Sequence, residues 1–240
     1  MAELKFSDLV EPVVVNQKTA LRVTVLGGGS FGTAMANTAV RNGCDTIIWI
    51  RDEAAAAEMN HAHVNKRYLP DFILEAGLKA VSDIETAVRD RDIILVAIPS
   101  HSFRDVLKQI QPFITSQAVI SLTKGIEAKT FHFMSDIIRE ELPEVPYGVL
   151  SGPNLAKEIM AGQPAGTVIA SESELVRYAV QQALHSALFR VFASDDVHGV
   201  ELGGALKNIY AVAMGMAAAY KVGENTKSMI LTRALAEMSR

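Results

Sequence analysis

Three glycines early in the chain have the spacing of a turn that binds a dinucleotide. Gly27, Gly29 and Gly32 form the pattern G-x-G-x-x-G directly after a short apolar run that begins at Val23. In this pattern the first glycine permits a tight turn, the second lets a pyrophosphate approach the backbone, and the third lets helix and strand pack closely. The start of the following helix offers free N–H groups to the anion. An apolar strand before the motif and a small-residue helix after it supply the context that this fingerprint requires.

The residues after the next predicted strand bear on the choice of cofactor. That strand, 46–50, ends about 20 residues beyond the last motif glycine, where the adenosine ribose is recognised. Arg51 follows it and favours the 2′-phosphate of NADP, although a solvated charge at a strand end is a comparable alternative. Asp52 either accepts the ribose hydroxyls of NAD or caps the next helix. The sequence therefore predicts NADP or NAD, with a preference for NADP.

Two lysines stand where they could act on a substrate. Lys124 lies between an apolar run and a glycine, so its ammonium can point into a crevice at the end of a strand. Lys207 lies in a long apolar helical pattern, 197–220, that should be buried, where a charge is costly unless it is paired or functional. Burial disfavours the charged form of a lysine, which suits proton transfer near neutral pH. A solvated loop lysine and a lysine snorkelling at a helix end are equal alternatives.

Alternating strand and helix patterns must position these residues. Strand and helix patterns alternate up to Ala193, which predicts an α/β fold with a doubly wound, mostly parallel, Rossmann-like sheet. Ligands bind outside the carboxyl ends of such strands. Pro99 ends the buried strand 92–98 and is expected to line the cofactor site, whereas His101 is interpreted as a helix-entry residue. Further strands are predicted at 78–81, 118–122, 147–150, 166–171 and 189–193.

The chain divides into three predicted parts. Residues 1–20 form a leader, 21–196 a dinucleotide-binding domain, and 197–240 the first helices of an all-α domain. The second of these helices covers 226–238, and the pattern reaches Arg240 without a stop signal such as Gly or Pro. We therefore expect the helical domain to be truncated at this point.

Composition excludes several classes of protein. A net charge of −4 gives no basic footprint for nucleic acid. Cys44 is the single cysteine, so an internal disulfide is impossible, which is typical of a reducing compartment. No apolar run approaches the ~20 residues that span a bilayer. His61 and His63 have no further ligand at metal-binding spacing, so no metal is expected. These observations predict a cytoplasmic protein.

Five stretches together resemble one known enzyme family. They are GGGSFGTA at 27–34, SLTKGI at 121–126, SGPNLAKEI at 151–159, ELGGALKNIYAVAMG at 201–215 and GENTKSMILTRALAEM at 223–238. In order and register they resemble the NAD(P)-dependent glycerol-3-phosphate dehydrogenases of the bacterial type. The resemblance implies a dinucleotide domain followed by an all-helical domain, and commonly a homodimer.

The resemblance also implies roles for particular residues. Lys207 matches the proton acceptor, with Asn208 beside it, and Lys124 matches a contact to both substrate and cofactor. Other matched positions line the substrate, namely Gly152 and Asn154, or the cofactor, namely Ser30, Phe31, Arg51 and Ala156. Two positions depart from the family pattern: Asn154 stands where many members have threonine or serine, and Glu224 stands where many have aspartate. The family's later aspartate and Ser-Arg-Asn cluster, which hold the substrate phosphate, have no counterpart before Arg240.

The implied reaction interconverts dihydroxyacetone phosphate, a small phosphorylated substrate, and sn-glycerol 3-phosphate with NAD(P)H. Its product is a precursor of glycerophospholipids. Two other functions stay open. One is another β-hydroxyacid-type dehydrogenase, since those also pair a dinucleotide domain with a helix-borne lysine and asparagine. The other is a non-catalytic NAD(P)-binding module that senses redox state.

Overall fold

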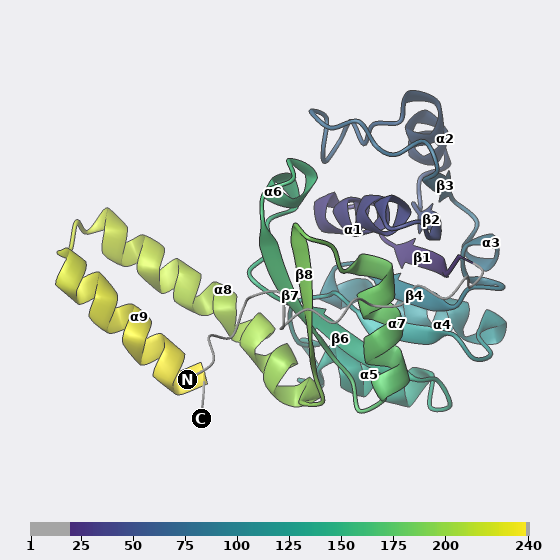
Figure 1. The fold of residues 1–240 in the computed structure, drawn as a ribbon. Helices are drawn as coiled ribbons and strands as arrows, with labels where there is room; N and C mark the ends of the chain where they lie inside the picture. The colour runs from purple at the N-terminus through teal and green to yellow at the C-terminus, as the bar shows by residue number, and fades with distance from the viewer. Residues whose placement is uncertain (1–19, 239–240) are drawn as a thin grey trace, which may run out of the picture.

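The chain folds into a parallel-rich sheet covered by helices, with a pair of helices that extends from it (Figure 1). The computed structural model describes residues 20–238, so nearly all of the predicted leader lies outside the described part. The strands are β1 (Arg22–Leu26), β2 (Asp45–Trp49), β3 (Lys79–Val81), β4 (Ile93–Val96), β5 (Ala118–Ser121), β6 (Tyr147–Ser151), β7 (Ala165–Ala170) and β8 (Phe189–Ser194). The α-helices are α1 (Ser30–Arg41), α2 (Glu53–Ala62), α3 (Ile84–Val88), α4 (Phe103–Ile110), α5 (Met134–Glu141), α6 (Ala156–Met160), α7 (Glu174–Leu184), α8 (Val197–Ala219) and α9 (Glu224–Met238).

The strand order confirms the predicted doubly wound sheet. It runs β3-β2-β1-β4-β5-β6-β7-β8, and the chain reverses its direction of travel between β1 and β4. Neighbouring strands are parallel except for β6 and β7, which are antiparallel. The loops after β1 and β4 leave the sheet in opposite directions, which opens a crevice at the carboxyl ends of these two strands.

Both faces of the sheet are buried, which explains the continuous apolar runs of the central strands. Val23 and Val25 point to the face covered by α1, α2, α6 and α7, whereas Leu26 points to the face covered by α3, α4 and α5. Thr24 is fully buried on β1 because its hydroxyl donates to the carbonyl of Ala87. Two apolar clusters, one on each face, therefore hold the carboxyl ends of the strands in place.

Side-chain caps begin several of the helices, among them the one considered for Asp52. Asp52, Asp83, Ser173 and Asp196 each accept a hydrogen bond from a backbone N–H in the first turn of α2, α3, α7 and α8. Such a cap satisfies one of the N–H groups that a helix start leaves unpaired. Gly29 precedes α1 and has no side chain, so the first N–H groups of α1 are not capped in this way.

Some predicted boundaries were wrong by a few residues. The strand predicted at 92–98 covers only Ile93–Val96, and the helix predicted at 226–238 begins at Glu224. Across residues 20–238, none of the helices is both long and apolar enough to cross a bilayer.

The long apolar helix α8 is less buried than its sequence predicts. Its first turns pack against β6, where a Cβ on Gly204 would lie 2.4 Å from the hydroxyl oxygen of Ser151. Farther along, α8 runs beside α9 and away from the sheet (Figure 1). Among the described residues, this leaves the apolar side chains Ile209, Val212 and Met216 of α8 more than half exposed. The prediction of burial was therefore wrong for this part of the helix, because α9 covers only one side of it.

Candidate active site

The glycine-rich turn has three positions with different steric demands. Gly27 has a φ of +121°, and a Cβ there would lie 2.4 Å from the carbonyl oxygen of Ala97. A Cβ on Gly32 would lie 2.1 Å from the carbonyl oxygen of Gly27. Gly29 differs, because a Cβ there would meet nothing within 4 Å. The fold itself thus requires Gly27 and Gly32, whereas the missing side chain of Gly29 leaves open space at the N-terminus of α1.

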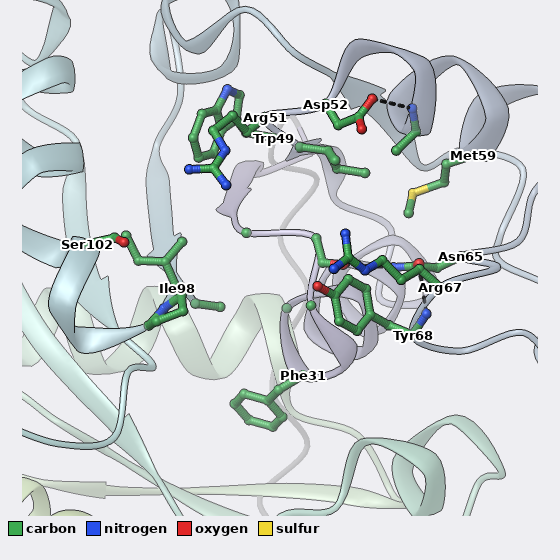
Figure 2. Close-up of a pocket in the computed structure, with 18 of the residues that line it drawn as sticks. Phe31, Trp49, Arg51, Asp52, Met59, Asn65, Arg67, Tyr68, Ile98 and Ser102 are labelled. Atoms are coloured by element: carbon green, nitrogen blue, oxygen red, sulfur yellow. Dashed lines mark hydrogen bonds between the residues drawn. The ribbon is translucent and has the colours of Figure 1, made fainter.

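A cavity of about 820 Å³ opens beside this turn, at the reversal point between β1 and β4. Figure 2 shows Ile98 and Ser102 on one side of the turn and Arg67 and Tyr68 on the other. Of the predicted cofactor-binding residues, the cavity is lined by Gly27, Gly29, Phe31, Gly32, Arg51 and Pro99. A cavity of this size at this position is typical of a small-molecule or cofactor site.

The residues around the cavity fit a dinucleotide. The uncapped N–H groups of α1 and the open space at Gly29 suit a pyrophosphate. Trp49, Ile98 and Val106 supply apolar surface for an adenine, and Arg51 supplies an exposed cation at the end of β2. The anion-binding groups and the apolar groups thus lie in one continuous space.

The structure distinguishes Arg51 from its neighbour Asp52. The side chain of Asp52 accepts from the N–H of Ala55 at 3.1 Å, so this carboxylate caps α2 (Figure 2). Arg51 is exposed and lines the cavity. The alternative in which Asp52 caps the next helix is therefore confirmed, although the carboxylate also borders the cavity.

The two candidate lysines come together near the ends of β5 and β6, on the opposite side of β4 from Trp49. Lys124, directly beyond β5, donates from Nζ to the carbonyl oxygen of Gly152 at 2.9 Å. Burial, together with the positive charge of Lys207, lowers the pKa of Lys124. Lys207 is partly buried on α8 and Asn208 is exposed. Lys207 thus affects the pKa of Lys124 although the two residues are 83 positions apart in the sequence, and Lys124 lies near the ends of β5 and β6.

The segment 151–156 is shaped by close backbone contacts. A Cβ on Gly152 would lie 2.8 Å from both Asn154 Oδ1 and the carbonyl oxygen of Gly166, so only glycine fits. Asn154 donates from Nδ2 to that same carbonyl at 2.8 Å. Its Oδ1 is buried without a hydrogen-bond partner, which leaves an acceptor available. Ala156 begins α6 nearby and, like Ser30, does not line the large cavity.

One wall of the cavity comes from the loop after α2, which contains none of the predicted site residues. Asn65, Lys66, Arg67 and Tyr68 follow α2 and line the cavity. Arg67 lies over the ring of Tyr68, with 5.2 Å between Cζ and the ring centroid. In the sequence, the two consecutive cations Lys66 and Arg67 beside Tyr68 are the signal that could have pointed to an anion-binding loop.

The sequence matches one enzyme family over most of its length. Residues 22–176 match the NAD-dependent glycerol-3-phosphate dehydrogenase N-terminus, and residues 196–240 match the corresponding C-terminus. A glycerol-3-phosphate dehydrogenase [NAD(P)+] of Acinetobacter baumannii is 85% identical over all 240 residues, which make up 67% of that protein. The enzyme of the same name from Acinetobacter baylyi is 82% identical over the same share.

A solved structure is similar in fold as well as in sequence. The crystal structure of glycerol-3-phosphate dehydrogenase from Coxiella burnetii superposes with a TM-score of 0.86 at 34% identity, over 92% of this chain and 68% of that one. A sequence identity of 34% over 92% of this chain shows a relationship in sequence as well as a similar fold. The chain belongs to the family of NAD-dependent glycerol-3-phosphate dehydrogenases.

Proposed function

We propose that this chain interconverts dihydroxyacetone phosphate and sn-glycerol 3-phosphate, with NAD or NADP bound in the cavity beside the glycine-rich turn. The product is a precursor of glycerophospholipids. Family membership supports the reaction, and the shape of the cavity supports the place of the cofactor. The observation that carries the assignment of the reacting groups is the pair Lys124 and Lys207, whose charges interact beside the end of β5.

The two lysines suit the polar half of the reaction. When bound, the nicotinamide cofactor supplies the hydride chemistry, and the protein must orient and polarise the carbonyl. We assign Lys207 as the group that stabilises the developing alkoxide and donates its proton, and that accepts the alcohol proton in the reverse direction. Lys124 has a supporting electrostatic role, because its hydrogen bond to Gly152 holds the ammonium in place.

Further residues are proposed to contact the substrate or the cofactor. Gly152, Asn154 and Asn208 are proposed to contact the substrate together with the lysines. The free acceptor Oδ1 of Asn154 supports this, because a buried unpaired acceptor can take a hydrogen bond from a hydroxyl. Cofactor contacts are proposed for the glycine-rich turn with Ser30 and Phe31, and for Arg51, Pro99, Lys124 and Ala156.

The test is the substitution Lys207→Ala, assayed by NADPH oxidation with dihydroxyacetone phosphate and by NADPH titration. We expect kcat to fall by ~10²–10⁴, the typical contribution of a positioned acid or base, with the Kd for NADPH nearly unchanged. Lys227→Ala is the matched control, since Lys227 lies on α9, is partly buried like Lys207, and pairs with the exposed Glu224 at 2.6 Å. It should leave kcat unchanged.

The outcomes separate the functions left open by the sequence. A loss of tenfold or less in Lys207→Ala would assign proton transfer to another group. Turnover of a β-hydroxyacid in place of dihydroxyacetone phosphate would favour the other type of dehydrogenase. NADPH binding without turnover of either substrate would favour a non-catalytic binding module.

We propose three further properties of the chain. A division of the chain into residues 21–196 and 197–240 is supported by the extension of α8 and α9 away from the sheet. A homodimer is supported by the exposed apolar side chains of α8, and sedimentation velocity would measure it. A cytoplasmic location is supported by Cys44, a lone buried thiol whose pKa burial raises to about 11, and localisation of a tagged chain would test it.

A further inference from the structure

The loop that forms one wall of the cofactor cavity is tied directly to the glycine-rich turn. We call residues 63–68 the wall loop; it follows α2 and precedes Leu69, a fully buried core residue. Lys66, Arg67 and Tyr68 are exposed, whereas Asn65 in the middle of the loop is only 6% exposed. A buried polar side chain within an otherwise exposed loop needs partners, because an unpaired buried amide is costly.

Asn65 finds those partners on the turn and helix that are expected to hold the pyrophosphate. Its Nδ2 donates to the carbonyl oxygen of Gly28 at 2.9 Å and to the hydroxyl oxygen of Thr33 at 2.8 Å. Its Oδ1 accepts from the N–H of Tyr68 at 3.3 Å. One side chain therefore joins the glycine-rich turn, the first turn of α1 and the far end of the wall loop.

The bond to Gly28 also sets the direction of a neighbouring donor. Peptide units are planar and trans, so the N–H of Gly29 points opposite to the carbonyl of Gly28. A carbonyl held by Asn65 thus fixes the orientation of the Gly29 N–H, at the position where no side chain obstructs a ligand. Loss of this bond would free the peptide unit to rotate.

We propose that Asn65 is a positioning residue for the dinucleotide. It acts through the peptide between Gly28 and Gly29, and it holds the wall loop so that Arg67, stacked on Tyr68, stays beside the bound anion. The link from Ser30 Oγ to the carbonyl of Tyr68, at 3.4 Å, ties the same loop to α1 a second time. The inference rests on the proposed function, because it takes the large cavity as the NAD(P) site.

Two variants and a matched control test this role through the Kd values of NADPH and NADH. Asn65→Ala removes all three side-chain hydrogen bonds and should weaken both nucleotides by about tenfold, since each hydrogen bond typically shifts an equilibrium several-fold. Asn65→Asp keeps the size and the acceptor for Tyr68, but it replaces the donor by an acceptor and adds a negative charge. It should bind both nucleotides more weakly than Asn65→Ala does.

Asn60 provides the control, because it makes an equivalent pair of bonds away from the cavity. Its side chain donates to the carbonyl oxygen of Ala80 at 2.8 Å and accepts from the N–H of Ala80 at 2.7 Å. Asn60→Ala should lower the melting temperature and leave both Kd values unchanged. The comparison separates a role in positioning from a role in stability alone.

The results distinguish failure of this inference from failure of the proposed function. If the unchanged chain binds neither nucleotide, the assignment of the cavity is wrong. If the unchanged chain binds them and the Asn65 variants bind within about twofold of it, Asn65 is a structural residue only. If Asn65→Ala does not fold, the inference is tested by Asn65→Asp and by hydrogen exchange of the Tyr68 backbone amide. NADPH should slow this exchange in the unchanged chain. An unaltered exchange rate would overturn the inference.

Discussion

At the scale of single residues, the glycine-rich turn shows that identical residues can meet different requirements. Gly32 is needed because a Cβ would overlap the backbone of Gly27, and Gly27 because of its positive φ and its contact with Ala97. Gly29 has free space around it, so the packing of the fold does not require a glycine there. Such open space is what the proposed approach of a pyrophosphate to the backbone would need.

The substitution Gly29→Val should therefore abolish binding of NADPH and leave the fold intact. The new side chain would occupy the space that the pyrophosphate needs, without meeting a protein atom at its Cβ. Fluorescence titration measures the binding, and circular dichroism the fold. Gly215→Val on α8, also at a position with nothing within 4 Å of a Cβ, is the control and should bind normally. Undiminished binding by Gly29→Val would mean that the turn is only structural.

Arg51 and Asp52 divide two tasks that the sequence could not separate. Because Asp52 caps α2, Arg51 is the more available group for a 2′-phosphate. Arg51→Ala should weaken NADPH by about 1.5–3 kcal/mol, as for a hydrogen bond to a charged group, and NADH much less. Asp52→Ala should instead cost about 1 kcal/mol of stability through the lost cap. An equal loss of both nucleotides in Arg51→Ala would place this arginine away from the 2′-phosphate.

At the scale of elements, α8 is attached to the sheet domain through a buried carboxylate. Glu201 is 4% exposed, and its Oε1 accepts from the N–H of Ser135 at 3.1 Å, while Oε2 accepts from the Ser135 hydroxyl. Burial raises the pKa of Glu201, and the hydrogen bonds from Ser135 offset part of that effect. The start of α5 is thus joined to the start of the helix that carries Lys207.

This raised pKa predicts a pH dependence of stability. Between the ordinary value of 4.5 and the higher folded value, the folded state holds more protons than the unfolded state. The contribution of Glu201 to the free energy of unfolding must then fall as pH rises through this window. Urea unfolding measures the free energy of unfolding of the unchanged chain and of Glu201→Gln. The value for the unchanged chain minus the value for Glu201→Gln should decrease from pH 4.5 upward. The exposed Glu144→Gln should show no such trend, and a constant difference for Glu201→Gln would contradict the prediction.

At the scale of the whole molecule, the site lies along the carboxyl edge of one sheet. The cavity proposed for the cofactor occupies the reversal point between β1 and β4, and the two lysines lie beyond it, past the ends of β5 and β6. The chain spans 67% of the length of its Acinetobacter relatives. Within residues 20–238, the side chains Ile209, Val212 and Met216 lie exposed on α8, in the part of this helix that follows Lys207. This surface is therefore the first place to look for association in solution.

The sequence by itself determined the order of strands and helices and predicted where a cofactor would bind, because both depend on short-range patterns. Continuous apolar runs specify strands buried on both faces, and the glycine spacing specifies the turn between β1 and α1. The five motifs were enough to identify the family, which the comparisons confirmed.

Only the tertiary structure decided which distant groups meet. Asn65 reaches Gly28 across 37 residues, and Lys207 influences Lys124 across 83, because helices and loops pack onto one edge of the sheet. The antiparallel direction of β7 and the exposure of α8 likewise depend on which elements cover each other. A local pattern shows that a helix is apolar, but its burial and its hydrogen bonds depend on contacts with residues distant in the sequence, which a local pattern does not specify.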